Sequence, residues 1–332
     1  MKTYLITGAA GFIGSHLAHA VVERGDAVRA LDNLSTGHRA NLAGLNSAGL
    51  EVAGLEAAEI QGRFEWIEAD LNDRAALACA CQGVDVILHQ AALPSVPRSI
   101  LDPAASHTAN LDGTFALLEA ARAAGVKRIV YAASSSAYGN QPGFPRVETM
   151  RSEPISPYAV QKLACEYYLQ SYWRVYGLET VCLRYFNVFG PRQDPSSQYS
   201  GVIARFAVEM LAGRTPTIFG DGGHSRDFTY VANVVNANLL AAEAPAERCA
   251  GGVFNIACGQ SYTLNQLYAA LARELGFPHP PQYAPERAGD VRESLADITA
   301  ARLALGYQPD IGFQEGIART AAWYRETGSS LA

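Results

Sequence analysis

A tyrosine and a lysine one helical turn apart are the residues best suited to chemistry in this chain. They lie in the stretch SPYAVQK, residues 156–162, as Tyr158 and Lys162. Ser156 is a favoured N-cap residue and Pro157 suits the first helical position, so the pattern predicts a helix that begins here. Because residues i and i+4 share one face of a helix, the ammonium group and the phenol are expected on the same side.

An ammonium group beside a phenol favours the ionised phenolate. At a separation of roughly 6 Å and an effective dielectric near 20, the attraction is about 3 kcal/mol. That attraction would lower the pKa of the Tyr158 phenol from its ordinary value of about 10. We therefore expect Lys162 to make Tyr158 a usable general base near neutral pH. The spacing YxxxK also occurs by chance, and an ordinary pair on a surface helix is the alternative.

Three serines offer hydroxyl groups that could join this pair. Ser134, Ser135 and Ser136 stand where an apolar run at residues 128–135 ends, in the sequence SSSAYG. The carboxyl ends of parallel strands form one edge of a sheet, and ligands bind there. Hydroxyl, phenol and amine are therefore predicted to converge on one hydride-transfer centre, with Ser134 and Ser136 as its catalytic hydroxyls. A serine-rich turn that only caps the next segment is the alternative.

A glycine-punctuated turn follows the first apolar run. In the stretch TGAAGFIG, Gly8 permits a tight turn, Gly11 admits the close approach of a pyrophosphate, and Gly14 lets a helix pack on the strand. The helix that opens here presents free amides and the positive end of its dipole to the phosphates. Asp32, at the end of the next strand, suits the adenosine ribose hydroxyls and repels a 2′-phosphate. These features predict a dinucleotide site that prefers NAD to NADP.

The elements that must position these groups alternate between strands and helices. Strands are predicted at residues 2–7, 27–31, 64–70, 84–92, 128–135 and 180–187. Helices are predicted between them, from the glycine turn to residue 24 and at residues 74–81, 111–124 and 157–176. This alternation indicates an α/β fold, in which helices cover both faces of a doubly wound parallel sheet in the Rossmann arrangement.

The regular alternation fades after residue 187. Residues 190–230 are rich in Gly, Pro and Asp, whereas a helix at 231–243 and a strand at 253–256 indicate a return to the sheet. Residues 41–62 are interpreted as a surface loop or a short helix. We predict two domains: an NAD-binding Rossmann domain formed by residues 1–187 with about 231–259, and a smaller, discontinuous α+β substrate-binding lobe formed by about 188–230 with 260–332.

Composition and charge exclude several classes of protein. The 332 residues are 49% hydrophobic and carry a net charge of −6 without a block of like charge, which favours a globular protein and disfavours nucleic acid or an anionic membrane as partners. Uncharged apolar runs are too short for a membrane span, and glycines interrupt the apolar N-terminus, so no secretion signal is inferred. The six cysteines lack CxxC spacing and the seven histidines form no ligand cluster. We expect a cytoplasmic protein without a metal.

The chain resembles the extended short-chain dehydrogenases/reductases and, within them, the nucleotide-sugar 4-epimerases. It is most similar to the bacterial UDP-N-acetylglucosamine 4-epimerases of surface-polysaccharide pathways. The motifs that carry the resemblance run nearly from end to end: TGAAGFIG (7–14), LDNLSTG (31–37), HQAALPSVPRSI (89–100), YAASSSAYG (131–139), SPYAVQK (156–162), LRYFNVFGPRQDP (183–195), SRDFTYV (225–231) and GDVRESLAD (289–297). The third and the last point more narrowly to epimerases of N-acetylated sugars.

The resemblance implies roles for many residues. NAD would contact Gly8, Gly11, Phe12, Ile13, Gly14, Asp32, Asn33, Ser35, Thr36, Gly37, Asp70, Leu71, Gln90, Ala91, Ala92, Asn110, Tyr158, Lys162 and Tyr185. The UDP-sugar would contact Ser95, Val96, Ser134, Ser135, Asn187, Val202, Arg226, Arg287, Asp290 and Ser294. For the two arginines, a surface salt bridge is the alternative. By analogy with the family, the helices at 111–124 and 157–176 would pair with their copies in a homodimer.

The reaction implied by the resemblance is the reversible inversion of C4 of the sugar. Tyr158 would remove the proton of the 4-hydroxyl while the C4 hydride passes to NAD, and the 4-keto sugar would rotate and take the hydride back on its other face. Glucose-specific epimerases often carry a lysine where this chain has Pro94 and a bulky residue where it has Ser294. The predicted substrates are therefore UDP-GlcNAc and UDP-GalNAc.

Several alternatives remain open. The chain could epimerise UDP-glucose and UDP-galactose. It could also epimerise or decarboxylate a UDP-uronate, and either reaction would need a positive group near C6. A 4,6-dehydratase would place an Asp-Glu pair directly after the catalytic hydroxyl residue, where this chain has Ser135 and Ser136, so the dehydratase is disfavoured. A non-catalytic dinucleotide-binding scaffold would need neither Tyr158 nor Lys162, and both are present.

Overall fold

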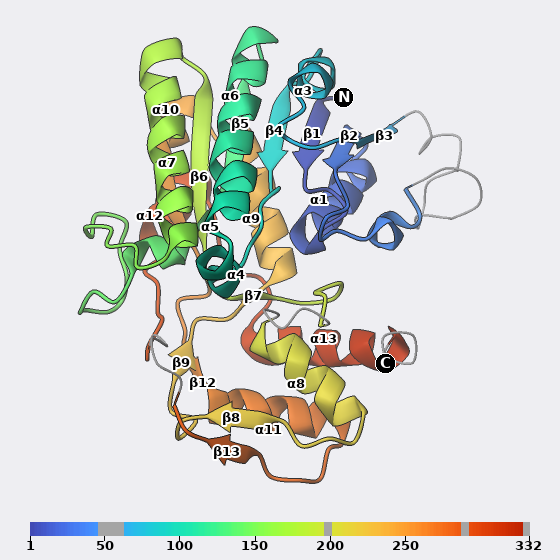
Figure 1. Cartoon of the computed structure of the whole chain (residues 1–332), viewed down its shortest axis with the longest axis vertical. Helices are drawn as coiled ribbons and strands as arrows, with labels where there is room; N and C mark the ends of the chain where they lie inside the picture. The colour runs from blue at the N-terminus through green and yellow to red at the C-terminus, as the bar shows by residue number, and fades with distance from the viewer. Residues whose placement is uncertain (46–62, 196–200, 287–291, 328–332) are drawn as a thin grey trace.

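The computed structural model describes residues 1–45, 63–195, 201–286 and 292–327. Most of the segment at 41–62 therefore lies outside the described residues, although its first two residues close a short 3₁₀ helix, η1 (Arg39–Leu42). The described helices and strands form a large upper part around one sheet and a smaller part below it (Figure 1).

The upper part is built on a sheet of seven parallel strands in the order β11-β6-β5-β4-β1-β2-β3. The order reverses at β1, as it does in a doubly wound sheet, so the predicted fold class is confirmed. Every strand predicted from an apolar run is present, within two or three residues of its predicted ends. In chain order the strands are β1 (Thr3–Thr7), β2 (Ala27–Asp32), β3 (Phe64–Glu68), β4 (Val86–His89), β5 (Arg128–Ser134), β6 (Glu179–Tyr185) and β11 (Gly252–Ile256).

Helices cover both faces of the sheet because each face buries its own apolar cluster. One cluster joins the strands to α1 (Phe12–Glu23), α9 (Val231–Glu243) and α12 (Thr299–Leu305). The other joins them to α3 (Arg74–Ala80), α6 (Gly113–Ala123) and α7 (Pro157–Tyr176). Figure 1 shows α6 and α7 in front of the strands and α9 behind them. Continuous apolar runs suit strands that are covered in this way on both sides.

The smaller part has its own apolar cluster, which lies among α8 (Val202–Leu211), α11 (Leu264–Leu275) and α13 (Phe313–Thr327). Two short sheets accompany these helices: β8 (Thr217–Phe219) with β13 (Gln282–Ala284), and β9 (Ser225–Arg226) with β12 (Tyr262–Thr263). Helix α8 was not predicted from the sequence, because the surrounding Gly and Pro residues outweighed its apolar pattern. That pattern is nevertheless amphipathic, with Ile203, Phe206 and Met210 buried on one face.

The structure also differs from the proposed boundary between the two parts. Helix α12 belongs by sequence to the segment assigned to the lobe, yet Ala301 and Leu305 pack in the cluster on the sheet. The domain assignment otherwise stays a prediction. The remaining described elements are short: α4 (Val96–Leu101), α5 (Pro103–His107), η2 (Thr108–Asp112), η3 (Ser135–Tyr138), β7 (Val188–Phe189), β10 (Thr229–Tyr230) and α10 (Ala246–Cys249).

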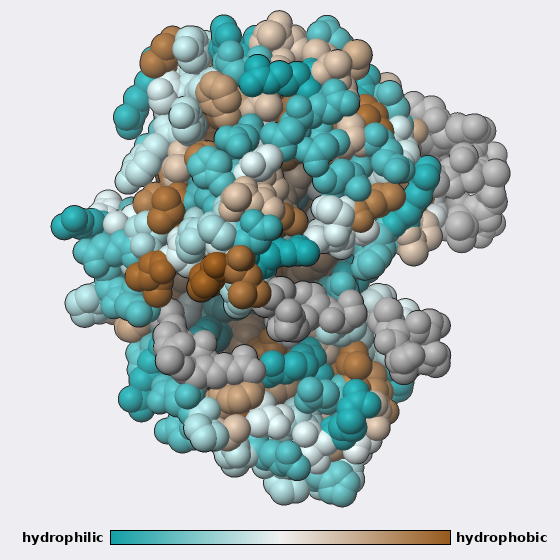
Figure 2. Space-filling view, viewed as in Figure 1, coloured by the Kyte–Doolittle hydropathy of each residue, from teal (hydrophilic) through white to brown (hydrophobic). Residues whose placement is uncertain are grey.

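The face shown in Figure 2 is mainly hydrophilic, with a hollow between the upper and lower parts and several apolar side chains gathered above it. Across the residues that the structure describes, none of the helices combines the length and the apolar character needed to cross a membrane.

Candidate active site

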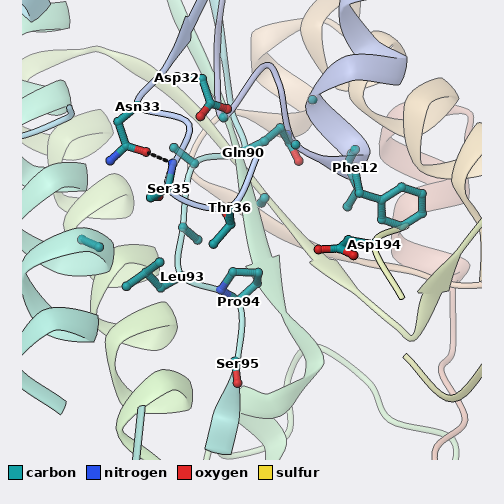
Figure 3. A pocket seen from close by; sticks show the side chains of 18 of the residues that line it. Phe12, Asp32, Asn33, Ser35, Thr36, Gln90, Leu93, Pro94, Ser95 and Asp194 are labelled. Carbon is teal, nitrogen blue, oxygen red and sulfur yellow. Dashed lines mark hydrogen bonds between the residues drawn. The ribbon is translucent and has the colours of Figure 1, made fainter. Parts of the chain in front are cut away.

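A cavity of about 830 Å³ opens at the carboxyl ends of the strands (Figure 3). Loops that follow β1, β2, β3 and β4 form one side, and α7 with the segment after β6 forms the other. Most of the residues predicted to contact the cofactor line it. They are Gly8, Gly11, Phe12, Ile13, Gly14, Asp32, Asn33, Ser35, Thr36, Asp70, Leu71, Gln90, Ala91, Ala92, Tyr158, Lys162 and Tyr185, joined by the predicted substrate residue Ser95.

The turn after β1 has no room for a side chain at Gly8 or Gly14. Gly8 has φ +66°, and a Cβ built on it would lie 2.7 Å from the backbone nitrogen of Ala91. A Cβ on Gly14 would overlap the carbonyl oxygen of Gly8. Gly11 is the N-cap residue of α1 and supplies no side-chain cap, so the first amides of this 12-residue helix face the cavity without a side-chain acceptor. A helix N-terminus with this geometry binds phosphate groups.

Asp32 is 7% exposed at the end of β2, and burial raises the pKa of its carboxyl group. Its two carboxylate oxygens accept hydrogen bonds from the backbone amides of Ala10 (2.9 Å) and Leu34 (2.8 Å). A carboxylate has about four acceptor sites, so this one can still accept a ribose hydroxyl. Gly37 does not line the cavity; a Cβ there would lie 3.0 Å from Asp32 Oδ2, so glycine leaves room for the carboxylate.

The ends of β2 and β3 are joined beside this carboxylate. Asn33 Nδ2 donates to Asp70 Oδ2 (2.6 Å), and Asn33 Oδ1 accepts from the backbone amide of Ser35 (3.0 Å; Figure 3). The first bond holds the loop after β2 against the end of β3, and the second bond shapes the loop itself. The predicted adenosine contacts are therefore placed along one rim of the cavity.

The predicted helix start is confirmed. Ser156 is the N-cap of α7 and its Oγ accepts from the backbone amide of Ala159 (3.2 Å), with Pro157 in the first helical position. Tyr158 and Lys162 both line the cavity. Lys162 is 3% exposed, and its Nζ donates to the carbonyl oxygen of Ala132 on β5 (2.8 Å). The amino group is therefore tethered to the strand that ends at the three serines.

The expected lowering of the Tyr158 pKa is wrong for this structure. Burial raises the pKa of Tyr158 to about 12, and the opposing hydrogen bond comes from Ser134. Burial also lowers the pKa of Lys162 to about 8. The physical reason is that the buried phenolate loses its hydration. The expectation counted only the attraction to the ammonium group and did not include this cost. Ser134 therefore supplies stabilisation of the phenolate that the sequence interpretation did not include.

The three serines lie at the end of β5, next to the cavity but outside its lining. Ser134 is the last residue of β5, and its Oγ lies 2.8 Å from Ser136 Oγ. Ser134 Oγ also accepts from the backbone amide of Ser136 (3.2 Å), while Ser135 begins η3. Ser134 reaches the cavity through its hydrogen bond with Tyr158.

A buried amide network that the sequence did not reveal lies under Tyr185. The Tyr185 hydroxyl donates to Gln90 Oε1 (3.2 Å) and accepts from Asn238 Nδ2 (2.7 Å). Gln90 Nε2 in turn donates to Asn238 Oδ1 (3.1 Å), which closes the ring of three side chains. Asn238 lies on α9 and is 0% exposed. A polar residue on the apolar face of the helix predicted at 231–243 was the sequence signal that could have revealed it.

Two further predicted residues lie outside the cavity lining. Asn110 is buried, accepts from the backbone amide of Leu93 (2.7 Å) and donates to Gln161 Oε1 (2.9 Å), so it supports the loop after β4. Val96 is 37% exposed at the start of α4, beside Ser95.

The cavity lining also contains four polar or charged residues that were not assigned from the sequence: His38, Arg98, Arg192 and Asp194.

A second cavity of about 300 Å³ lies in the lower part and contains three of the predicted substrate residues, Asn187, Val202 and Arg226. It shares Val188, Gln193 and Gly201 with the larger cavity, so the two adjoin. Asn187 Nδ2 lies 3.4 Å from Ser294 Oγ, to which it donates a hydrogen bond. Arg287 and Asp290 lie outside the described residues.

Comparisons with known proteins agree with this geometry. Residues 4–257 match the family described as "Epimerase: NAD dependent epimerase/dehydratase family". A protein of Mycolicibacterium smegmatis named "UDP-glucose 4-epimerase" is 41% identical over 98% of this chain and 99% of its own. The solved UDP-N-acetylglucosamine 4-epimerase from Methanobrevibacter ruminantium M1, in complex with UDP-N-acetylmuramic acid, has a TM-score of 0.89 at 38% identity over 98% and 99% of the two chains. The UDP-glucose 4-epimerase of Thermus thermophilus, in complex with NAD, has a TM-score of 0.83 at 36% identity, over 97% and 99%.

Proposed function

The chain belongs to the NAD dependent epimerase/dehydratase family, and on that basis we propose that it interconverts UDP-GlcNAc and UDP-GalNAc by inversion at C4. The observation that carries the proposal is the placement of Tyr158, with Ser134 hydrogen-bonded to it, beside Lys162 on the wall of the large cavity. The large cavity adjoins the second cavity in the lower part.

The large cavity fits NAD. Gly14 lets α1 pack closely on the glycine turn, where a Cβ would overlap backbone, and the first amides of α1 face the cavity. Asp32 retains acceptor capacity for ribose hydroxyls and repels a 2′-phosphate. When bound, NAD supplies a reversible acceptor for the C4 hydride and adds positive charge near the phenol.

The chain's own residues then perform the proton transfer and hold the substrate. Tyr158 takes the proton of the sugar 4-hydroxyl, and Ser134 with Ser136 orients that hydroxyl and stabilises the phenolate. Lys162 provides the nearby positive charge. Asn187 and Arg226 bind the UDP moiety, since arginine suits a diphosphate, while the sugar rotates between its two faces.

The preference for N-acetylated sugars rests on Ser294 and Pro94. Ser294 is half-buried and contacts Asn187, so a small side chain borders the proposed UDP-sugar site. Pro94 lines the large cavity next to Ser95 and presents no long charged side chain there. Together they leave space for the 2-N-acetyl group in both orientations of the sugar.

Replacing Ser294 by Tyr tests this preference. We expect the variant to lose turnover of UDP-GlcNAc and UDP-GalNAc and to keep or improve turnover of UDP-glucose and UDP-galactose, because a bulky side chain excludes only the larger sugar. Purified protein is incubated with each sugar and the epimers are resolved. UDP-glucuronate is included because Arg98 lines the cavity and could meet a carboxylate. Equal losses on both pairs, or a wild type that prefers UDP-glucose, would contradict the assignment.

We also propose that the protein is a cytoplasmic homodimer that serves polysaccharide biosynthesis. Phe115 on α6 and Tyr167, Tyr168 and Val175 on α7 are exposed, and these two helices form the face proposed for the partner copy. Free buried thiols such as those of Cys165 and Cys182 are consistent with a reducing compartment. Light scattering of the wild type and of Tyr167→Glu tests the dimer: a dimeric wild type and a monomeric variant are expected.

A further inference from the structure

A third ionisable residue follows the tyrosine and the lysine on the same face of α7. Tyr158, Lys162 and Glu166 are each four residues apart, and Glu166 is only 1% exposed. Its carboxylate accepts two hydrogen bonds from Arg184 of β6, one from Nε to Oε1 (2.9 Å) and one from Nη2 to Oε2 (2.7 Å). This two-bond geometry fixes the carboxylate in place behind Lys162.

Arg184 is itself fixed by contacts that do not involve the cavity. It is 4% exposed, and its guanidinium carbon lies 4.7 Å from the centroid of the Tyr138 ring. Arg184 Nη2 also donates to Ser152 Oγ (3.3 Å). The Tyr138 hydroxyl donates to Asn255 Oδ1 (2.7 Å), so the ring beneath the guanidinium is held as well.

Among the described groups that face the Lys162 amino group, the carboxylate is that of Glu166. The titratable and charged groups around that amino group come from three strands and from α7: His89, Tyr131, Tyr158, Cys165, Glu166 and Cys182. Burial lowers the pKa of His89 to about 3, so the imidazole is neutral. Burial raises the pKa of both thiols, so they are also neutral near pH 8. Glu166 therefore provides the negative charge that opposes the desolvation of the ammonium.

We propose that Glu166, held by Arg184, is a positioning residue that keeps the Lys162 amino group charged at the cavity wall. The proposal rests on the proposed function, in which that charge assists Tyr158. Arg184 contributes to the same arrangement. Its positive charge stabilises the buried carboxylate, which stays in electrostatic contact with the lysine.

The Lys162 amino group can be observed directly, because the chain has three lysines: Lys2, Lys127 and Lys162. Protein labelled with ¹³Cε-lysine and saturated with NAD is titrated by NMR, with the exposed Lys2 and Lys127 as internal references. Glu166→Gln is expected to lower the measured pKa of Lys162 by about 1 or more. The alkaline limb of the kcat profile should move to lower pH by the same amount, and Glu166→Asp should restore part of the shift.

A second, largely buried ion pair, between the first residues of β5 and β6, provides the control. Arg128 Nε donates to Glu179 Oε2 (2.8 Å), and the two side chains are 6% and 13% exposed. Glu179→Gln should leave the Lys162 titration and the kcat profile unchanged.

A folded Glu166→Gln protein with the wild-type Lys162 titration would overturn the proposal, whatever its activity. If that variant does not fold, the pair is removed as a unit in Glu166→Gln/Arg184→Gln, since replacing both partners is tolerated better than replacing one. A smaller decrease in the Lys162 pKa is then expected, and an unchanged value overturns the proposal. Failure of the proposed function is seen separately, as full epimerase activity in Lys162→Ala.

Discussion

Replacing Tyr158 by Phe is expected to remove nearly all epimerase turnover, by about 100-fold or more. The phenol is the proposed proton acceptor at the cavity wall, and Ser134 hydrogen-bonds to it. Phe keeps the ring and its packing, so the fold and the binding of UDP-sugar should be retained. Turnover is measured on UDP-GlcNAc, binding by calorimetry with UDP-GlcNAc, and folding by thermal denaturation.

Tyr4→Phe is the matched control for the loss of a buried phenol hydroxyl. Tyr4 lies in β1 with its hydroxyl buried and without a hydrogen-bond partner among the described residues, so its removal should leave turnover intact. A Tyr158→Phe protein that keeps a tenth of the wild-type rate would remove the tyrosine from its assigned role.

Lys162→Ala should reduce turnover as severely as Tyr158→Phe. Ser134→Ala should cost less, because Ser136 Oγ lies 2.8 Å from Ser134 Oγ and can take over the hydrogen bond.

Gly14→Ala is expected to abolish the binding of NAD. The new Cβ would overlap the carbonyl oxygen of Gly8, and both groups are backbone-bound, so the first turn of α1 has to move away from the end of β1. That movement displaces the amides that face the phosphates. Wild-type protein should carry NAD through purification, and the variant should not. The measurement is an NAD and NADP assay on the supernatant of denatured protein.

Gly312→Ala is the control for a glycine substitution as such. Apart from Gly312 and its two chain neighbours, no heavy atom of the described residues lies within 4 Å of a Cβ built at Gly312, so this variant should keep its NAD. NAD retained by Gly14→Ala at the wild-type stoichiometry would contradict the assigned position of the phosphates. NADP in place of NAD in the wild type would contradict the role of Asp32.

The sheet and its helices were predictable because their signals are local. Apolar runs with small or polar residues at their ends mark each strand of the upper part, and the N-cap pair Ser156–Pro157 marks the start of α7. Helix α8 was missed because its neighbours are rich in Gly and Pro. The placement of α12 on the sheet depends on contacts with residues far away in sequence, and no pattern within the helix indicates them.

Residue types and their order along the chain were enough to place the glycine turn, Asp32 at the end of β2, and Tyr158 and Lys162 at helical spacing. These features follow from local rules, because turn geometry and helical periodicity act over a few residues. The burial of each group and the side chains that it meets arise from the folded chain instead. Burial sets the cost of charging Tyr158 and Lys162, while Ser134, Asn238 and Arg184 come from strands and helices that are distant in sequence and meet only through long-range packing.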